Sequence, residues 1–267
     1  MPSHDLTQSL DADATVYPGD PPVESTPAAT HDEDGYRVTE WRLGTHSGTH
    51  VDAPSHTEPE GKNLDAFGVE EFVFEARLVD CSHLGAREPI GPEMVPERGR
   101  AEENRKAEKN GRAEENERAE KNRTARNGTA RSGTTRDELV VFRTGWADHW
   151  GTERYFDHPY LSREAAATCA ERGFHVGMDA LSPDPSPSER EATTGEEASD
   201  ETSESAERDE ETEPEGVPAH RELLGSERFV VENLTGLAGL PERFELRAYP
   251  LALAAADGSP VRAVATW

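Results

Sequence analysis

The chain has 267 residues, of which 33% are hydrophobic, and its formal net charge is -27 at pH 7. This charge argues against nucleic-acid binding through a basic patch, and no stretch approaches the roughly 20 apolar residues of a membrane-spanning helix. The amino terminus also lacks the basic start and apolar run of a secretory signal peptide. We therefore expect a cytoplasmic protein without a nucleic-acid or membrane partner.

Two low-complexity segments interrupt the chain. Residues 97–136 carry twelve basic and eight acidic residues, and residues 184–215 carry fourteen acidic residues against two arginines. Segments of this composition cannot bury enough apolar surface to offset their ordering entropy. We predict one domain over residues 1–267, interrupted by a charged insertion and by an acidic, disordered one. Lys62 is the single lysine outside both segments, and such an acidic surface is typical of a halophilic protein.

Seven short runs have the composition of β-strands. They are rich in Val, Phe, Leu and Arg and are bounded by Gly, Pro or Asp. One helix is predicted between Ser162, which can cap its start, and Gly173, which suits its end, and a shorter one over residues 219–227. Strands outnumber helices, which indicates a mixed β/α domain whose loops carry the chemistry. The predicted strands are residues 36–44, 72–80, 138–145, 174–179, 228–233, 244–253 and 260–267.

Residues 46–56, HSGTHVDAPSH, place three histidines and an aspartate within eleven residues. Their Gly, Thr, Val and Pro residues oppose a helix, whereas in an extended chain His46, His50 and Asp52 share one face. A straight strand would hold the Cα atoms of His46 and His50 roughly 13 Å apart, so the chain must bend, and Gly48 allows the bend. Two imidazole nitrogens and one carboxylate oxygen suit zinc or another borderline divalent ion and leave a coordination position open for catalysis.

A second pair, His220 and Glu232, lies far along the chain. Alone it is weak evidence, because Glu232 could simply end a strand. A carboxylate has two oxygens, so Asp52 could bridge to a second ion held by His220 and Glu232. Two ions about 3.5–4 Å apart would polarise a carbonyl and ionise water together.

The remaining histidines are weaker candidates for the site. We expect the first group to be solvated, because its members lie in polar or turn-like surroundings, and the second to be hydrogen-bonded near strand ends. The first group is His4, His31, His149 and His158, and the second is His83 and His175.

The stretch HSGTHVDAPSH resembles the HxGTHxDxPxH signature of the cyclase family, whose best-known members are the bacterial kynurenine formamidases. DLTQSL with VYPGDPP, LVVFRTGW, VGMDALSPDPS, the HRELLG…VVENL block and FELRAYPLALAAADGSPVRAVA follow in the family's order. The resemblance therefore covers nearly all of the ordered chain. It implies a swivelling β/β/α-type domain of mixed α/β class, a homodimer, and a centre of two divalent ions, normally Zn²⁺ with Mn²⁺ as an alternative.

The resemblance also implies a role for each candidate site residue. It makes His56 the proton donor and acceptor, because an imidazole can do both near neutral pH. Tyr17 stands where the formamidases have a Trp that lines the substrate pocket, and it still offers an aromatic face. The metal ligands would be His46, His50 and Asp52 for one ion and Asp52, His220 and Glu232 for the other.

The activity implied is hydrolysis of a C–N amide bond in a small molecule. The named activity is that of an arylformamidase, which converts N-formyl-L-kynurenine to L-kynurenine and formate in tryptophan breakdown. A hydrolase of another cyclic amide or lactone, such as isatin, is an alternative within the same family. An inactive metal-binding scaffold is an alternative from another class, which the presence of His56 disfavours, because a binder without activity does not need it.

Overall fold

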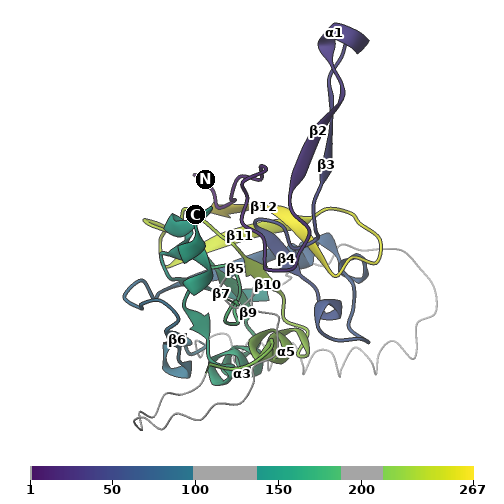
Figure 1. The fold of residues 1–267 in the computed structure, drawn as a ribbon. Coiled ribbons are helices and arrows are strands. Elements are labelled where there is room, and N and C mark those ends of the chain that lie inside the picture. The colour runs from purple at the N-terminus through teal and green to yellow at the C-terminus, as the bar shows by residue number, and fades with distance from the viewer. Residues whose placement is uncertain (1, 99–136, 188–212) are drawn as a thin grey trace, which may run out of the picture.

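Short strands dominate the computed structural model, which describes residues 2–98, 137–187 and 213–267 (Figure 1). All seven predicted strands are present, most of them with shorter ends than predicted. The strands are β1 (Ser3–Asp5), β2 (Glu24–Ala29), β3 (Val38–Arg42), β4 (His50–Asp52), β5 (Val73–Asp80), β6 (Pro89–Ile90), β7 (Asp137–Arg143), β8 (Tyr160–Leu161), β9 (His175–Met178), β10 (Val230–Glu232), β11 (Arg243–Pro250) and β12 (Gly258–Thr266).

The main sheet closes on itself. Its order is β1-β12-β11-β5-β7-β9-β10-β4, and an additional pairing of β4 with β12 joins all of these strands except β1 into a ring. Strands β5, β7, β9 and β10 run parallel to one another, whereas β10–β4, β4–β12, β12–β11 and β11–β5 pair antiparallel. The predicted mixed α/β domain is therefore present as a barrel-like sheet, and its swivelling arrangement stays a prediction.

The two halves of the ring are buried differently. In the parallel half, Leu139 and Val141 of β7 join one hydrophobic cluster while Val140 and Phe142 join another, so the strand is covered on both faces. Such double burial is usual for parallel strands, whose neighbouring helices cover them. In the antiparallel half, one face of β11 is buried and the other carries exposed or partly exposed side chains. One hydrophobic cluster thus fills the ring, and the other lies under the helices.

The helices are few and short in the described residues. They are α1 (His31–Asp34), α3 (Arg163–Arg172) and α5 (Pro218–Leu224). The caps predicted for α3 are present: the Ser162 hydroxyl accepts the N–H of Ala165 and Gly173 has a φ of 74°. Helix α5 ends three residues before the predicted 227, with Gly225 as its C-cap, and the chain then turns through Glu227, which has a φ of 55°. Helices α3 and α5 pack against each other, and none of the described helices is long and apolar enough to cross a membrane.

Strands β2 and β3 form a two-stranded ribbon that stands away from the barrel, with α1 at its tip (Figure 1). The sequence predicted β3 but not β2, because Thr26 is the single β-branched residue of ESTPAA and the segment has no aromatic residue. Tyr36, Val38 and Trp41 of this ribbon are exposed. A lone two-stranded ribbon is marginally stable in water, and the exposure of these apolar side chains means that they do little to stabilise this one.

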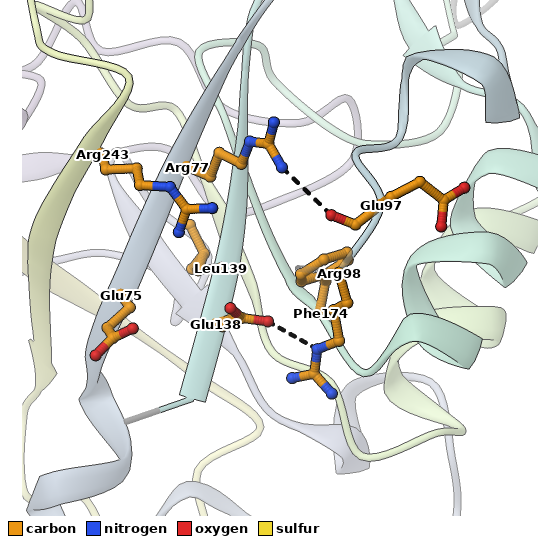
Figure 2. Close-up of a pocket in the computed structure, with 8 residues that line it drawn as sticks. All are labelled: Glu75, Arg77, Glu97, Arg98, Glu138, Leu139, Phe174 and Arg243. Atoms are coloured by element: carbon orange, nitrogen blue, oxygen red, sulfur yellow. Dashed lines mark hydrogen bonds and ion pairs between the residues drawn. The ribbon is translucent and has the colours of Figure 1, made fainter. Parts of the chain in front are cut away.

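The structure describes residues 97–98 at the start of the first predicted insertion and residues 184–187 and 213–215 at the two ends of the second. Figure 2 shows a surface pocket at the start of the first one, where Arg98 pairs with Glu138 at 2.7 Å and Arg77 donates to the carbonyl of Glu97. Within the second, Asp184 is 1% exposed. The interiors of the predicted insertions, residues 99–136 and 188–212, lie outside the described residues.

Candidate metal centre

The segment before β4 bends sharply at Gly48. This residue has a φ of 64°, a left-handed conformation that favours glycine. A Cβ atom there would also lie 2.6 Å from Leu10 Cδ2. The bend turns His46 back toward β4, where His50 and Asp52 follow in extended chain. The predicted hinge is therefore present.

The bend brings the first three predicted ligands together. His46 Nδ1 lies 2.7 Å from Asp52 Oδ1, and His50 Nε2 lies 3.2 Å from the same oxygen. Gly258 on the neighbouring strand β12 makes room, since a Cβ atom there would lie 2.6 Å from His46 Cε1. Both the hinge and the adjoining strand thus need glycine for the imidazole of His46 to reach Asp52.

The remote pair reaches the same point through the sheet. Strand β10 runs antiparallel to β4, with Glu232 opposite His50, and Glu232 Oε2 lies 3.2 Å from His50 Nε2. His220 lies on α5, and its Nε2 is 3.1 Å from Glu232 Oε1 and 3.6 Å from Asp52 Oδ2. Residues more than 150 positions apart therefore form one cluster around Asp52.

The outer nitrogen of each deeply buried imidazole is held by an oxygen. His50 Nδ1 donates to the carbonyl of Gly48 at 2.7 Å, and His220 Nδ1 donates to Asp184 Oδ2 at 2.7 Å. A proton fixed on Nδ1 leaves the lone pair on Nε2 free and aimed at the cluster, which is the usual way in which metal-binding histidines are oriented. Asp184 also accepts the backbone N–H groups of Ala219 and His220.

Asp184 was not among the site residues predicted from the sequence, because it opens the acidic stretch whose composition indicates disorder. A usable signal was nevertheless present. Asp184 is separated from the rest of the acidic run by a Pro-rich stretch, and it lies within the block VGMDALSPDPS of the family resemblance.

Asn233 ties the Glu232 strand to the glycine bend. Its backbone has a φ of 56°, its side-chain amide donates to the carbonyl of Gly48 at 3.0 Å, and its own carbonyl accepts the hydroxyl of Thr49 at 2.6 Å. Tyr155 donates its hydroxyl to Asn233 Oδ1 at 2.9 Å. Asn233 thereby fixes the two chain segments that carry His50 and Glu232.

The electrostatics of the cluster couple its imidazoles to its carboxylates. Burial alone would lower the pKa of His50, but the Asp52 carboxylate outweighs it and the pKa lies well above its usual value. Burial would also lower the pKa of His220, but its hydrogen bond to Asp184 and the nearby carboxylates of Asp52 and Glu232 raise it well above its usual value. Burial would raise the pKa of Asp52, but the charges of His50 and His46 hold it well below normal. Protons on the imidazoles and a divalent cation would therefore compete for the same negative charge.

The donor set fits a divalent cation. His50 Nε2, Asp52 Oδ2 and Glu232 Oε1 are buried without a hydrogen bond of suitable geometry, although they lie within ion-pair distance of their neighbours. Buried polar atoms of this kind are costly unless something satisfies them. Two sets of nitrogen and oxygen donors, each within 4.8 Å of one another, share Asp52. One set is His46, His50 and Asp52, and the other is Asp52, His220 and Glu232.

His56 lies at the edge of the cluster in the short turn Pro54–His56. Its ring centroid is 4.0 Å from that of His46 and 5.5 Å from that of His220. Its side chain is 30% exposed, and burial lowers the pKa of this imidazole below its usual value. His56 is therefore neutral at pH 7 and open to a substrate.

Tyr17 is partly buried against the hydrophobic cluster under the helices. Burial raises the pKa of its hydroxyl, and the charges of His220, Asp184 and Glu232 also act on it. Tyr17 is thus close enough to the cluster for these charges to change the pKa of its hydroxyl, and one of them is that of His220 on α5.

Among the other histidines, two expectations are wrong. His83 was expected to be hydrogen-bonded near a strand end, but it is exposed. His158 was expected to be solvated, but it is 1% exposed, with Nδ1 donating to the carbonyl of Pro159 and Nε2 accepting the hydroxyl of Ser186. Its polar neighbours in sequence hid a buried position. His175 begins β9 and its Nδ1 accepts the N–H of Phe229 at 2.8 Å, as expected for a hydrogen-bonded histidine near a strand end.

Comparison with known proteins places the chain in a family. A family model described as putative cyclase matches residues 4–185, which is more than half of the chain. The chain belongs to the putative cyclase family. The matched range contains His46, His50, Asp52 and His56 and ends before His220 and Glu232.

Relatives and solved structures match nearly the whole chain. Kynurenine formamidases from Bacillus cereus (strain ZK / E33L) and Salinibacter ruber (strain DSM 13855 / M31) are each 28% identical to it, over 263 and 268 residues, covering 97% of this chain and 95% of the relative. Isatin hydrolase A from Labrenzia aggregata has a TM-score of 0.66 at 22% identity, covering 99% of this chain and 93% of that one. A potential metal-dependent hydrolase with cyclase activity has a TM-score of 0.62 at 20% identity, covering 99% and 96%. At these identities the solved structures support the fold.

Proposed function

We propose that the protein is a metal-dependent hydrolase of a C–N amide bond, with N-formyl-L-kynurenine as its substrate and L-kynurenine and formate as its products. The observation that carries this proposal is the meeting of His50 Nε2 and His220 Nε2 with two buried carboxylates. Full-length similarity to kynurenine formamidases supports the substrate.

The residues that would hold the metal follow from the two donor sets. His46, His50 and Asp52 would hold one ion, and Asp52, His220 and Glu232 would hold the other. Mixed nitrogen and oxygen donors suit Zn²⁺, with Mn²⁺ as an alternative. Bound there, such ions would supply Lewis acidity toward a carbonyl oxygen and hydroxide near neutral pH.

His56 would move the proton that the reaction requires. Being neutral, its imidazole can accept a proton as water adds to the amide carbon and can return it to the nitrogen as the C–N bond breaks. The nitrogen then leaves as an amine with one added hydrogen, and the carbon leaves as formate with the added oxygen. His56 is suited to this role because it borders the cluster while its side chain stays accessible.

Tyr17 would contact the aromatic ring of the substrate. Its phenol ring offers an apolar face, and the charges of His220, Asp184 and Glu232 act on its hydroxyl, so a ring bound against Tyr17 would lie near the metal centre. The Tyr17→Phe variant should therefore keep turnover with little change in KM, whereas Tyr17→Ala should raise KM.

A cyclic aryl amide is the second candidate substrate, favoured by the likeness of the fold to isatin hydrolases. The same bond type is cleaved in both reactions, but opening a ring gives one product and hydrolysis of a formamide gives two. The protein, purified in concentrated salt and loaded with Zn²⁺, should be assayed with N-formylkynurenine and with isatin. Formate release supports the formamidase, and ring opening without formate release supports the second candidate.

The inactive-scaffold alternative makes a different prediction in the same assay. A scaffold would bind metal or none and would hydrolyse neither substrate, even with all the candidate ligands intact.

A homodimer stays a prediction, which light scattering at high salt would test by the mass of the particle in solution.

A further inference from the structure

Asp257 borders the cluster and was not singled out by sequence analysis. It directly precedes β12, and its backbone carbonyl accepts the N–H of Ala53 at 2.8 Å, which fixes it beside the end of β4. The hydroxyl of Thr45 donates to Asp257 Oδ1 at 3.1 Å. One carboxylate oxygen is therefore anchored, and the other, Oδ2, faces the histidines.

The second carboxylate oxygen of Asp257, Oδ2, lies between two imidazoles with different proposed roles. His46 Nε2 is 3.2 Å from Oδ2, and His56 Nδ1 is 3.7 Å from the same atom. The first distance is that of a hydrogen bond. The second is longer than the usual 2.7–3.2 Å, but such bonds are often long before a substrate binds.

With Asp257, each of the three imidazoles assigned to the metal has its outer nitrogen beside an oxygen acceptor. His50 uses the carbonyl of Gly48 and His220 uses Asp184, while His46 uses Asp257. Asp184 and Asp257 differ in one respect. The Asp184 carboxylate contacts one imidazole, whereas the Asp257 carboxylate faces a proposed ligand and the proposed proton-transfer residue together.

We propose that Asp257 is a positioning residue that fixes the ring orientation and tautomer of His56 while it orients His46. A proton on His56 Nδ1, facing Asp257, leaves Nε2 as the nitrogen that exchanges protons with the substrate. The same carboxylate balances the charge of His56 while that ring carries a second proton. This inference rests on the role assigned to His56 in the proposed function.

The test compares Asp257→Asn with Asp184→Asn in the full-length protein. Both variants weaken the hold on one imidazole, so each should lower Zn²⁺ affinity about 10–100-fold, measured by competition with a chromophoric chelator. Only Asp257→Asn should also lower kcat at saturating Zn²⁺, by about 10–100-fold, with KM little changed. Full recovery of kcat in Asp257→Asn at saturating Zn²⁺ would overturn the proposal.

A second readout does not depend on turnover. Nitrogen-15 NMR of the imidazole rings in metal-free protein, at a pH where His56 is neutral, should show its proton on Nδ1 in the wild type. An Asn amide can donate to Nδ1, so the proton should move toward Nε2 in Asp257→Asn and stay on Nδ1 in Asp184→Asn. An unchanged tautomer would overturn the proposal, whereas the expected shift in a protein that hydrolyses nothing would refute the proposed function and leave the positioning role standing.

Thr45→Val provides a milder variant. It removes the hydroxyl that anchors Oδ1 but keeps the carboxylate, so kcat should fall in the same direction by a smaller factor. A Thr45→Val protein with kcat lower than that of Asp257→Asn would contradict the proposal.

Discussion

Two sets of buried histidines in this protein behave in opposite ways. His50 and His220 lie in the metal centre, and His158 and His175 lie in the hydrophobic interior, yet all four are at most 5% exposed. Carboxylates raise the pKa of the first two against the effect of burial. Burial lowers the pKa of His158 to about 4 and that of His175 to about 3. Burial alone therefore does not identify a functional histidine. The groups that contact its ring do identify it.

The partners of the interior histidines explain this difference. His175 stacks on Phe229 at 5.0 Å between ring centroids and accepts that residue's backbone N–H. His158 pairs with a carbonyl and a hydroxyl. These neutral groups satisfy a neutral imidazole, and the carbonyl beside His158 favours an imidazolium less than burial disfavours it, whereas Asp52 and Glu232 attract a proton or a cation.

The largest effects should come from replacing a proposed metal ligand, His50, or the proposed proton-transfer residue, His56. His50→Ala should lose bound metal and all activity, because it removes a donor shared by Asp52 and Glu232. His56→Ala should keep metal and lose turnover about 10²–10⁴-fold, as expected for proton transfer. Metal content by mass spectrometry and kcat check both. Equal metal loss in the two variants would contradict the roles assigned to them.

His175→Gln is the matched control, since it changes a buried histidine of the interior. It should keep metal and kcat and change only the stability of the fold. Loss of metal in this variant would remove the distinction between the two sets.

The next effect is on stability in acid. The folded pKa of His175, about 3, lies below its unfolded value of about 6.5. Its contribution is fully present above pH 6.5 and is lost as pH falls from about 6.5 toward about 3. In metal-free protein the unfolding free energy of His175→Gln should fall less steeply there, by up to about 1.4 kcal/mol per pH unit. Urea unfolding at several pH values tests this, and parallel pH dependences of the two proteins would refute it.

The smallest effect should follow removal of residues 188–212. Ser186 and Glu213, close to the two ends of this segment, both contact Arg87, so a short Gly-Ser linker can join the two ends. Activity and metal content at high salt should stay close to those of the full chain. A deletion starting at Asp184 should instead lose metal affinity, because it removes the partner of His220. Collapse of the shorter deletion would show that the removed segment supports the fold.

The sequence was most informative where the site is local. Within His46 to Asp52, alternation and a glycine hinge were enough to predict that three side chains converge, because few chain conformations satisfy both. The residues Ser162 and Gly173 likewise located the two ends of α3, because serine suits the start of a helix and glycine its end. Each of these patterns acts within a few residues.

Contacts across the barrel could not be predicted in this way. Asp257 reaches His46 only because β12 pairs with β4 and closes the ring. Local periodicity does not predict the order of strands in a sheet. Asp184 was assigned to a disordered segment by composition, although its carboxylate holds α5 and His220. His158 was misplaced because its turn-like sequence surroundings indicated exposure, whereas the fold buries it with the carbonyl of Pro159 and the hydroxyl of Ser186 as partners.

The most direct test of the metal centre is zinc-edge anomalous diffraction from crystals of the full chain loaded with Zn²⁺. We predict ions about 2.0–2.1 Å from His50 Nε2 and from His220 Nε2, with Asp52 between them. Absence of an ion there, or an ion held only by His46, His56 and Asp257, would contradict it.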